Sequence, residues 1–277
     1  MRIVGLGGDA MRFGLIGLLV VLLCSVPVLS QAEGRRVALV IGNAQYASAP
    51  DLANPGNDAR DVSKVLGDLG FILIGGGAQV DLGRTQMLRL IRELGQTVRR
   101  GDTVFFFYAG HGVQFDGQNY LLPVDDGEIK AQEDLPDHAP SLDTLQRNLD
   151  GQGAALTFLV LDACRDNPLP ARTRTASRGL AAIEQARLGQ GTVVAFATAP
   201  GATASDGTGR NGVFTAALLA ALRKDATRRV DDILYEVTGL VQEKTGSAQR
   251  PWVNINLMGP TFLLPPPAQP SPVVPMA

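Results

Sequence analysis

Three nearly continuous apolar segments limit the folds that are open to this chain. None of them shows the alternation of polar and apolar residues that a half-exposed strand has. Residues 37–42, 103–108 and 156–161 are dominated by Val, Leu, Ile, Ala and Phe. A strand with one face in water alternates, whereas a strand covered on both faces does not. Because helices supply such covers, we predict an α/β fold, a three-layer αβα sandwich with a mostly parallel central sheet.

Segments with helical spacing separate these runs. Apolar residues recur three and four positions apart in residues 57–69 and 87–98, which predicts amphipathic helices there. The other expected elements are strands at 71–74, 192–198 and 252–256, a hairpin arm at 117–124, a small helix at 141–149, and helices at 212–224 and 230–244. Residues 265–277 are rich in proline, which is typical of a disordered tail.

The N-terminal segment has the pattern of an export signal. A short basic start at Met11-Arg12 leads into an apolar run, which ends in the small residues Ser30-Gln31-Ala32 that a signal peptidase reads. Pro27 interrupts the run, and a span of this length is short for a membrane anchor. We therefore expect residues 1–32 to be a signal peptide and the mature protein to be periplasmic or secreted, with no stable membrane span.

Cysteine content narrows the chemistry. The chain has two cysteines, and removal of residues 1–32 takes Cys24 and leaves Cys164 alone. Structural cysteines of exported proteins normally pair, so a single one either has a chemical role or is incidental. The formal net charge of −2, without a run of Lys or Arg, gives no indication of a nucleic-acid partner.

A histidine is placed in the same way as this cysteine. Cys164 closely follows the apolar run 156–161, and His111 closely follows the run 103–108 between two glycines. A thiol and an imidazole at the ends of buried strands meet the requirements of a Cys–His nucleophilic pair, in which the imidazole takes the thiol proton. The backbone N–H groups of Cys164 and Gly112 are the expected donors for the oxyanion.

Each of these residues also has a plainer interpretation. A lone buried cysteine is commonly an inert small apolar residue, and a Gly-His-Gly turn alone is a weak signal. The pair is more specific than either part, because the chain has only two histidines. The other one, His138, lies in a polar stretch and is expected to be a surface residue.

Four short motifs extend this pattern along the chain. They are Val37-Ala-Leu-Val-Ile-Gly-Asn43, Gly56-Asn-Asp-Ala-Arg60, Phe107-Tyr-Ala-Gly-His-Gly112 and Leu161-Asp-Ala-Cys-Arg165. Together they resemble the caspase-like cysteine peptidases, and among these the bacterial metacaspase-like branch. The resemblance implies His111 and Cys164 as the catalytic dyad and a central sheet of about six strands. It also implies a peptidase domain over 33–264, made of a larger-subunit-like part (35–164), a linker loop (165–191) and a smaller-subunit-like part (192–264).

The resemblance also implies a specificity pocket. Metacaspase-like members bind Arg or Lys before the cut with acidic residues, which match Asp58, Asp162 and, more weakly, Asp206 here. Converging carboxylates would attract a guanidinium. The alternative is that Asp58 only favours a helix N-terminus and Asp162 only caps a strand end. Ala109 stands where the better-known metacaspases have a serine that lines this pocket.

The function that follows is a cysteine endopeptidase that cleaves peptide or protein substrates after Arg or Lys and needs no cofactor. Calcium activates some metacaspases, but the pairs Asp125-Asp126 and Asp231-Asp232 are too weak a signal to predict a site. A non-catalytic caspase-like interaction module and a thiol hydrolase of non-peptide amides or esters remain alternatives. The arginines of the 165–191 loop lie within tethered reach of the expected pocket, so self-cleavage and an uncut surface loop are both open.

Overall fold

The computed structural model describes residues 34–164, 169, 180, 188–199, 207 and 209–266. The expected signal peptide at 1–32, Asp206, most of the 165–191 loop and most of the tail at 265–277 lie outside the described residues. The strands are β1 (Arg36–Gly42), β2 (Ile72–Leu73), β3 (Gln79–Val80), β4 (Thr103–Phe115), β5 (Gln118–Leu121), β6 (Leu156–Cys164), β7 (Thr192–Phe196) and β8 (Trp252–Asn256). The α-helices are α1 (Pro55–Asp68), α2 (Arg84–Thr97), α3 (Leu135–His138), α4 (Leu142–Leu149), α5 (Val213–Lys224) and α6 (Val230–Lys244).

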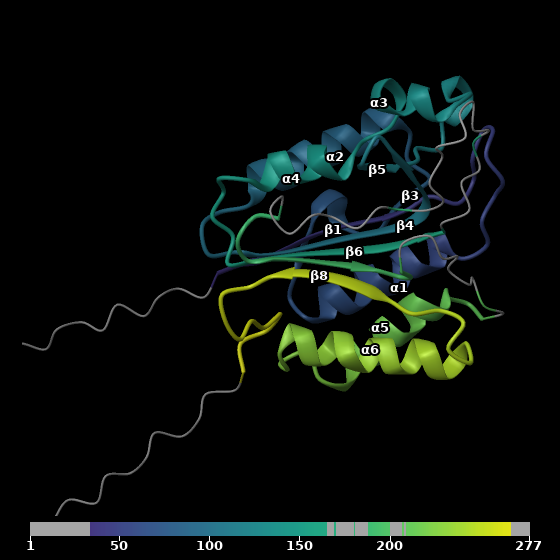
Figure 1. The fold of residues 1–277 in the computed structure, drawn as a ribbon. Coiled ribbons are helices and arrows are strands. Elements are labelled where there is room, and N and C mark those ends of the chain that lie inside the picture. The colour runs from purple at the N-terminus through teal and green to yellow at the C-terminus, as the bar shows by residue number, and fades with distance from the viewer. Residues whose placement is uncertain are drawn as a thin grey trace, which may run out of the picture. The chain divides into compact units, whose positions relative to one another are not determined.

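The strands form one sheet in the order β2-β1-β4-β6-β7-β8, with β3 paired to β1 and β5 paired to β4 (Figure 1). The pairs from β2 to β7 are parallel, and β8 runs antiparallel to β7 at the edge. The expected mostly parallel sheet is therefore confirmed. Six strands form its main path, as expected, and the two short strands β3 and β5 are additions to it.

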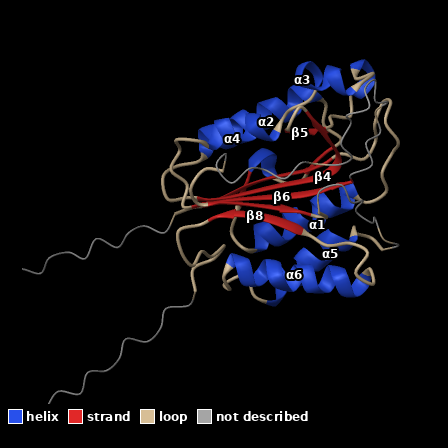
Figure 2. Cartoon of the chain, viewed as in Figure 1, coloured by secondary structure: helices blue, strands red, loops and turns tan. Residues whose placement is uncertain are grey.

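Helices cover both faces of the sheet, which explains why the central strands are apolar throughout. Helices α1, α5 and α6 lie on one face, and α2 and α4 lie on the other (Figures 1 and 2). Along β4, Phe105 and Phe107 belong to the core on the α1 side, whereas Phe106 and Tyr108 belong to the core on the α2 side. All four side chains are fully buried, so both faces of the strand are apolar apart from the hydrogen-bonded Tyr108 hydroxyl.

The sequence placed the end of one central strand wrongly. The strand that begins at Thr103 was expected to end at His111, but β4 continues beyond that residue to Phe115. The outer part of β4 pairs with β5 in an antiparallel hairpin, from Gly112 opposite Leu121 to Phe115 opposite Gln118, and this pairing extends the strand. His111 therefore lies inside a strand, whereas Cys164 is the last residue of β6 as expected.

Asp102 ties the start of the domain to the turn before β4. The carboxylate accepts hydrogen bonds from the backbone N–H of Arg35 and of Arg99, each at 2.9 Å, and from the Arg35 guanidinium at 2.6 Å. Burial raises the pKa of Asp102, but the Arg35 side chain and these backbone donors outweigh it and hold the pKa below its usual value. The ionised form is therefore the one that stabilises the fold.

We expect Asp102→Asn to lower the free energy of unfolding by about 1.5–3 kcal/mol at neutral pH, the usual value of hydrogen bonds to a charged group. A folded-state pKa below the unfolded value means that the carboxylate stabilises above about pH 4, and that this is lost as the pH falls through the folded pKa. Urea unfolding at pH 7 and pH 3 should show the deficit of the variant shrinking with acid. A deficit that is equal at both pH values would contradict this account. The control is Asp68→Asn, which removes an exposed partner of Lys64 and should change stability by less than about 0.5 kcal/mol.

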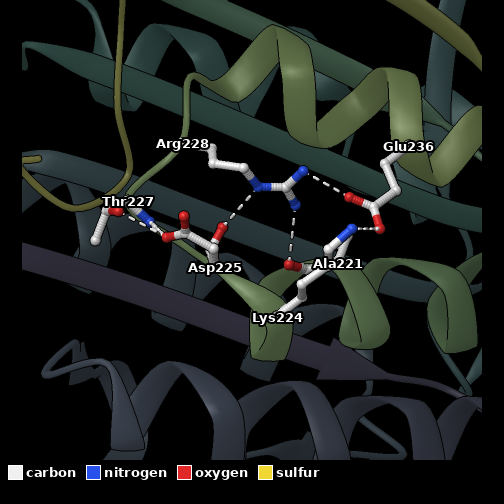
Figure 3. Close-up of polar contacts among 6 residues, drawn as sticks. All are labelled: Ala221, Lys224, Asp225, Thr227, Arg228 and Glu236. Atoms are coloured by element: carbon white, nitrogen blue, oxygen red, sulfur yellow. Dashed lines mark hydrogen bonds and ion pairs between the residues drawn. The ribbon is translucent and has the colours of Figure 1, made fainter.

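The turn between α5 and α6 is fixed by one arginine (Figure 3). The Arg228 guanidinium donates to the carbonyl oxygens of Ala221 (3.3 Å) and Asp225 (3.2 Å) at the C-terminal end of α5. It also pairs with Glu236 of α6 at 2.5 Å, and Lys224 contacts the other oxygen of that carboxylate at 3.0 Å. The Arg228 guanidinium thus adds a second donor to the Ala221 carbonyl, which already accepts from the Asp225 N–H, and it joins the two helices.

Candidate active site

The sheet brings the two predicted dyad residues together. Strands β4 and β6 are parallel neighbours, and their register pairs His111 directly with Cys164. The preceding pairs, Gly110 with Ala163 and Ala109 with Asp162, are in the same register. Paired residues on adjacent strands have neighbouring backbones, so His111 and Cys164 occupy adjacent positions near the carboxyl ends of two central strands. Ligand sites of open α/β sheets are found at this edge.

The His111 ring is held in one orientation. It is 4% exposed, and its Nε2 lies 2.8 Å from the carbonyl oxygen of Pro50. A carbonyl oxygen only accepts, so Nε2 carries the hydrogen in this contact. In the neutral ring Nδ1 then holds the lone pair, and it is the nitrogen able to take a proton from a thiol.

Two tyrosine hydroxyls hold the backbone of His111. Its N–H donates to Tyr46 Oη at 2.9 Å, and Tyr108 Oη lies 2.9 Å from its carbonyl oxygen. The Tyr46 ring also lies against the imidazole, with the ring centroids 4.7 Å apart. The tyrosines approach through Gly110, where a Cβ would lie 2.7 Å from both hydroxyl oxygens and where φ is +151°. Glycine is therefore required at position 110.

Gly112, the expected oxyanion donor, lies in β4 just beyond His111. A Cβ added there would come within 2.9 Å of both the Cβ of Ala163 and a methyl carbon of Leu180. Contacts this close leave no room for a side chain at position 112, so glycine is the residue that fits beside the dyad.

The two carboxylates of the expected specificity pocket meet at Gly212. A Cβ on Gly212 would lie 3.2 Å from Oδ2 of Asp162 and 3.4 Å from Oδ2 of Asp58. Asp58 is 3% exposed and lies in the first turn of α1. Asp162 lies in β6, on the face of the sheet that α1 and α5 cover. The third candidate, Asp206, lies outside the described residues.

Hydrogen-bond donors and helix N-termini stabilise these two negative charges. The Gly212 N–H donates to Asp58 Oδ1 at 3.1 Å, and both the N–H (3.2 Å) and the hydroxyl (2.5 Å) of Thr215 donate to Asp162 Oδ2. Asp58 and Thr215 belong to the first turns of α1 and α5, where the positive ends of the helix dipoles lie. The plainer interpretation of Asp162 as a cap thus describes part of its role, although it caps a helix and not a strand.

An ion pair closes one side of this region. The Arg210 guanidinium donates to both oxygens of Asp61, at 2.9 and 3.0 Å, and the Asn211 side chain donates to the same carboxylate at 3.0 Å. The hydrogen bonds from Arg210 hold the pKa of Asp61 below its usual value. Asp61 therefore anchors the segment that leads into Gly212 and engages the nearby arginine.

Sequence reasoning missed Tyr46, Pro50, Gly212 and Thr215, all of which contact predicted site residues. His138 ends the short helix α3 and is partly exposed. Among the described residues, no group of three or more His, Cys, Asp or Glu side chains is arranged to hold a metal ion. Within the same part of the chain, no helix is both long and apolar enough to cross a membrane.

Comparison with known proteins gives one family. Residues 35–262 match the family model described as the caspase domain. A stretch of 130 residues is 28% identical to mucosa-associated lymphoid tissue lymphoma translocation protein 1 of Homo sapiens, and equally to its homolog of Mus musculus. That stretch is 47% of this chain but only 15% of either relative. Caspase-1 from Spodoptera frugiperda has a similar structure, with a TM-score of 0.60 and 19% identity over 86% of this chain and 92% of that one.

Proposed function

This chain belongs to the caspase domain family of peptidases, and on that premise we propose that it is a cysteine endopeptidase with Cys164 as nucleophile and His111 as base. The observation that carries the proposal is the register of β4 and β6, which makes these two residues direct neighbours. The contact between His111 Nε2 and the Pro50 carbonyl supports it, because it assigns the base role to Nδ1.

In the proposed reaction, Cys164 attacks the scissile carbonyl and its proton passes to His111. The tetrahedral intermediate carries a negative charge, for which the backbone N–H groups of Gly112 and Cys164 are the proposed donors. His111 then gives the proton to the leaving amine, and water hydrolyses the thioester.

The proposed substrates are peptides with Arg or Lys before the cut. Asp58 and Asp162 support this, because their oxygens face the same point beside Gly212 and a guanidinium could contact both. The charge of the nearby Arg210 is engaged by Asp61. A cationic substrate side chain at this point would face both carboxylates.

A panel of fluorogenic substrates on the protein without residues 1–32 tests this function. We expect turnover of peptides with Arg or Lys before the cut, little turnover with Asp, and none in Cys164→Ala. Faster turnover of simple esters or small amides than of peptides would support the thiol hydrolase. A lack of turnover across the whole panel, with calcium added as well, would support the non-catalytic module.

We also propose that the protein is exported. The apolar segment that ends in Ser30-Gln31-Ala32 supports removal of residues 1–32, so the mature chain should begin near Glu33. N-terminal sequencing of the protein from the periplasmic or culture fraction should find that start. An intact Met1 or Met11 on soluble cytoplasmic protein would contradict export.

A further inference from the structure

The loop that carries Pro50 is fixed along its length. Six consecutive backbone N–H groups, those of residues 44–49, all have acceptors at 2.7–3.1 Å, and five of them donate to carboxylates. The acceptors are Asp81 for residues 44 and 45, Asp51 for 46, the Val124 carbonyl for 47, and Asp126 for 48 and 49. A loop in which every N–H is engaged is preorganised, and such support is usual where a functional group must be held in one geometry.

Asp126 holds the two residues that directly precede Pro50. It is 1% exposed, and its two oxygens accept from the Ser48 and Ala49 N–H groups, each at 2.7 Å. The next residue is Pro50, whose carbonyl contacts His111 Nε2 at 2.8 Å. Proline has a fixed φ, so the bonds just before it restrict the position of its carbonyl carbon and thereby of the carbonyl group that contacts His111.

We propose that Asp126 is a positioning residue for His111, acting through Pro50. The inference rests on the proposed function, since it assumes that His111 works as the base. With the Pro50 carbonyl in place, the ring keeps its hydrogen on Nε2 and its lone pair on Nδ1. When the carbonyl is displaced, the ring loses that restraint, and molecules with the hydrogen on Nδ1 cannot take the thiol proton there.

The neighbouring acid has a different partner, which provides a matched control. Asp125 accepts from the Arg84 N–H at 2.8 Å, at the start of α2, whereas the six N–H groups of the loop at 44–49 donate to other acceptors. Asp125→Asn and Asp126→Asn remove the same charge from adjacent positions. Only Asp126→Asn sets an amide NH₂ against a backbone donor of the loop.

The test combines kinetics with the tautomer of His111. For Asp126→Asn we expect kcat to fall by about 10- to 100-fold, the scale of a small misplacement of a catalytic group, with KM changed less than about twofold. Asp125→Asn should stay within about twofold of the wild type in both constants. The chain has only two histidines, so ¹⁵N NMR resolves His111 from His138. The Nε2–H fraction of His111 should fall in Asp126→Asn, while His138 stays unchanged.

A second variant covers the case in which Asp126→Asn does not fold. Asp81 has φ +54°, which glycine adopts without strain, so Asp81→Gly should fold while freeing the other end of the loop. Asp81→Gly should lower both kcat and the Nε2–H fraction of His111, and each decrease should be smaller than in Asp126→Asn. If Asp126→Asn folds and keeps the wild-type tautomer and kcat, the positioning role is overturned. If it does not fold, the same result in Asp81→Gly overturns it. If the wild type has no peptidase activity, the proposed function fails, whereas the tautomer comparison still decides whether Asp126 orients His111.

Discussion

Replacement of Cys164 by Ala is expected to abolish peptidase activity, with kcat/KM reduced by about 10³-fold or more, the scale found for members of a catalytic unit. His111→Ala should cause a loss of similar size, and the double variant should be little worse than either single one. The reason is that the thiol and the base act in the same step, so removal of one leaves nothing for the other to do.

Two controls separate this loss from a loss of folding. His111 is buried and its ring lies against Tyr46, so thermal unfolding of each variant must accompany the kinetics. His138→Ala removes the other histidine, which is partly exposed and takes no part in the proposed reaction, and should leave kcat/KM within about twofold. Proteolysis near the wild-type level in Cys164→Ala would show that the nucleophile has been assigned wrongly.

The layers of the fold could be predicted because a strand that is buried on both faces has a continuous apolar sequence. Phe105, Phe106 and Phe107 follow one another in β4 because alternate residues enter different cores, and no strand with a wet face would have this pattern. The extension of β4 to Phe115 left no such mark, because it depends on pairing with β5 and not on burial alone. Local pattern gives the elements, and pairing decides where they end.

Some residues of the candidate site could likewise be predicted from the sequence pattern, and others only from the tertiary structure. His111 and Cys164 were found because a thiol and an imidazole are rare in this chain and each follows an apolar run. The Pro50 carbonyl could not be found, because every residue has a carbonyl and only the tertiary fold shows which one the ring meets. The meeting of Asp58 and Asp162 was expected only through the family resemblance, since Gly212, which lies between them, is far from both along the sequence.

The largest change in specificity is expected from Asp162→Asn. Loss of one carboxylate from a partly desolvated guanidinium pocket should cost about 2–4 kcal/mol of transition-state binding for substrates with Arg before the cut. This corresponds to a decrease of about 30- to 1000-fold in kcat/KM. Asparagine keeps an oxygen where Oδ2 accepts both Thr215 donors, so the cap on α5 and the thermal stability should largely remain. Asp58→Asn should act in the same direction, because Asn keeps the acceptor for the Gly212 N–H.

The decisive measurement compares the kcat/KM values of two substrates, with Arg or citrulline before the cut, in the wild type and in Asp162→Asn. If Asp162 binds the cation, Asp162→Asn should lose the preference for Arg over a neutral isostere such as citrulline, because citrulline lacks the charge that the carboxylate attracts. If Asp162 only caps α5, both substrates should be affected equally and in step with stability. Asp68→Asn removes a charge from the far end of α1, next to Lys64, and should leave the ratio unchanged. A wild-type protein that prefers Asp before the cut would refute the pocket altogether, because two carboxylates beside Gly212 would repel that substrate.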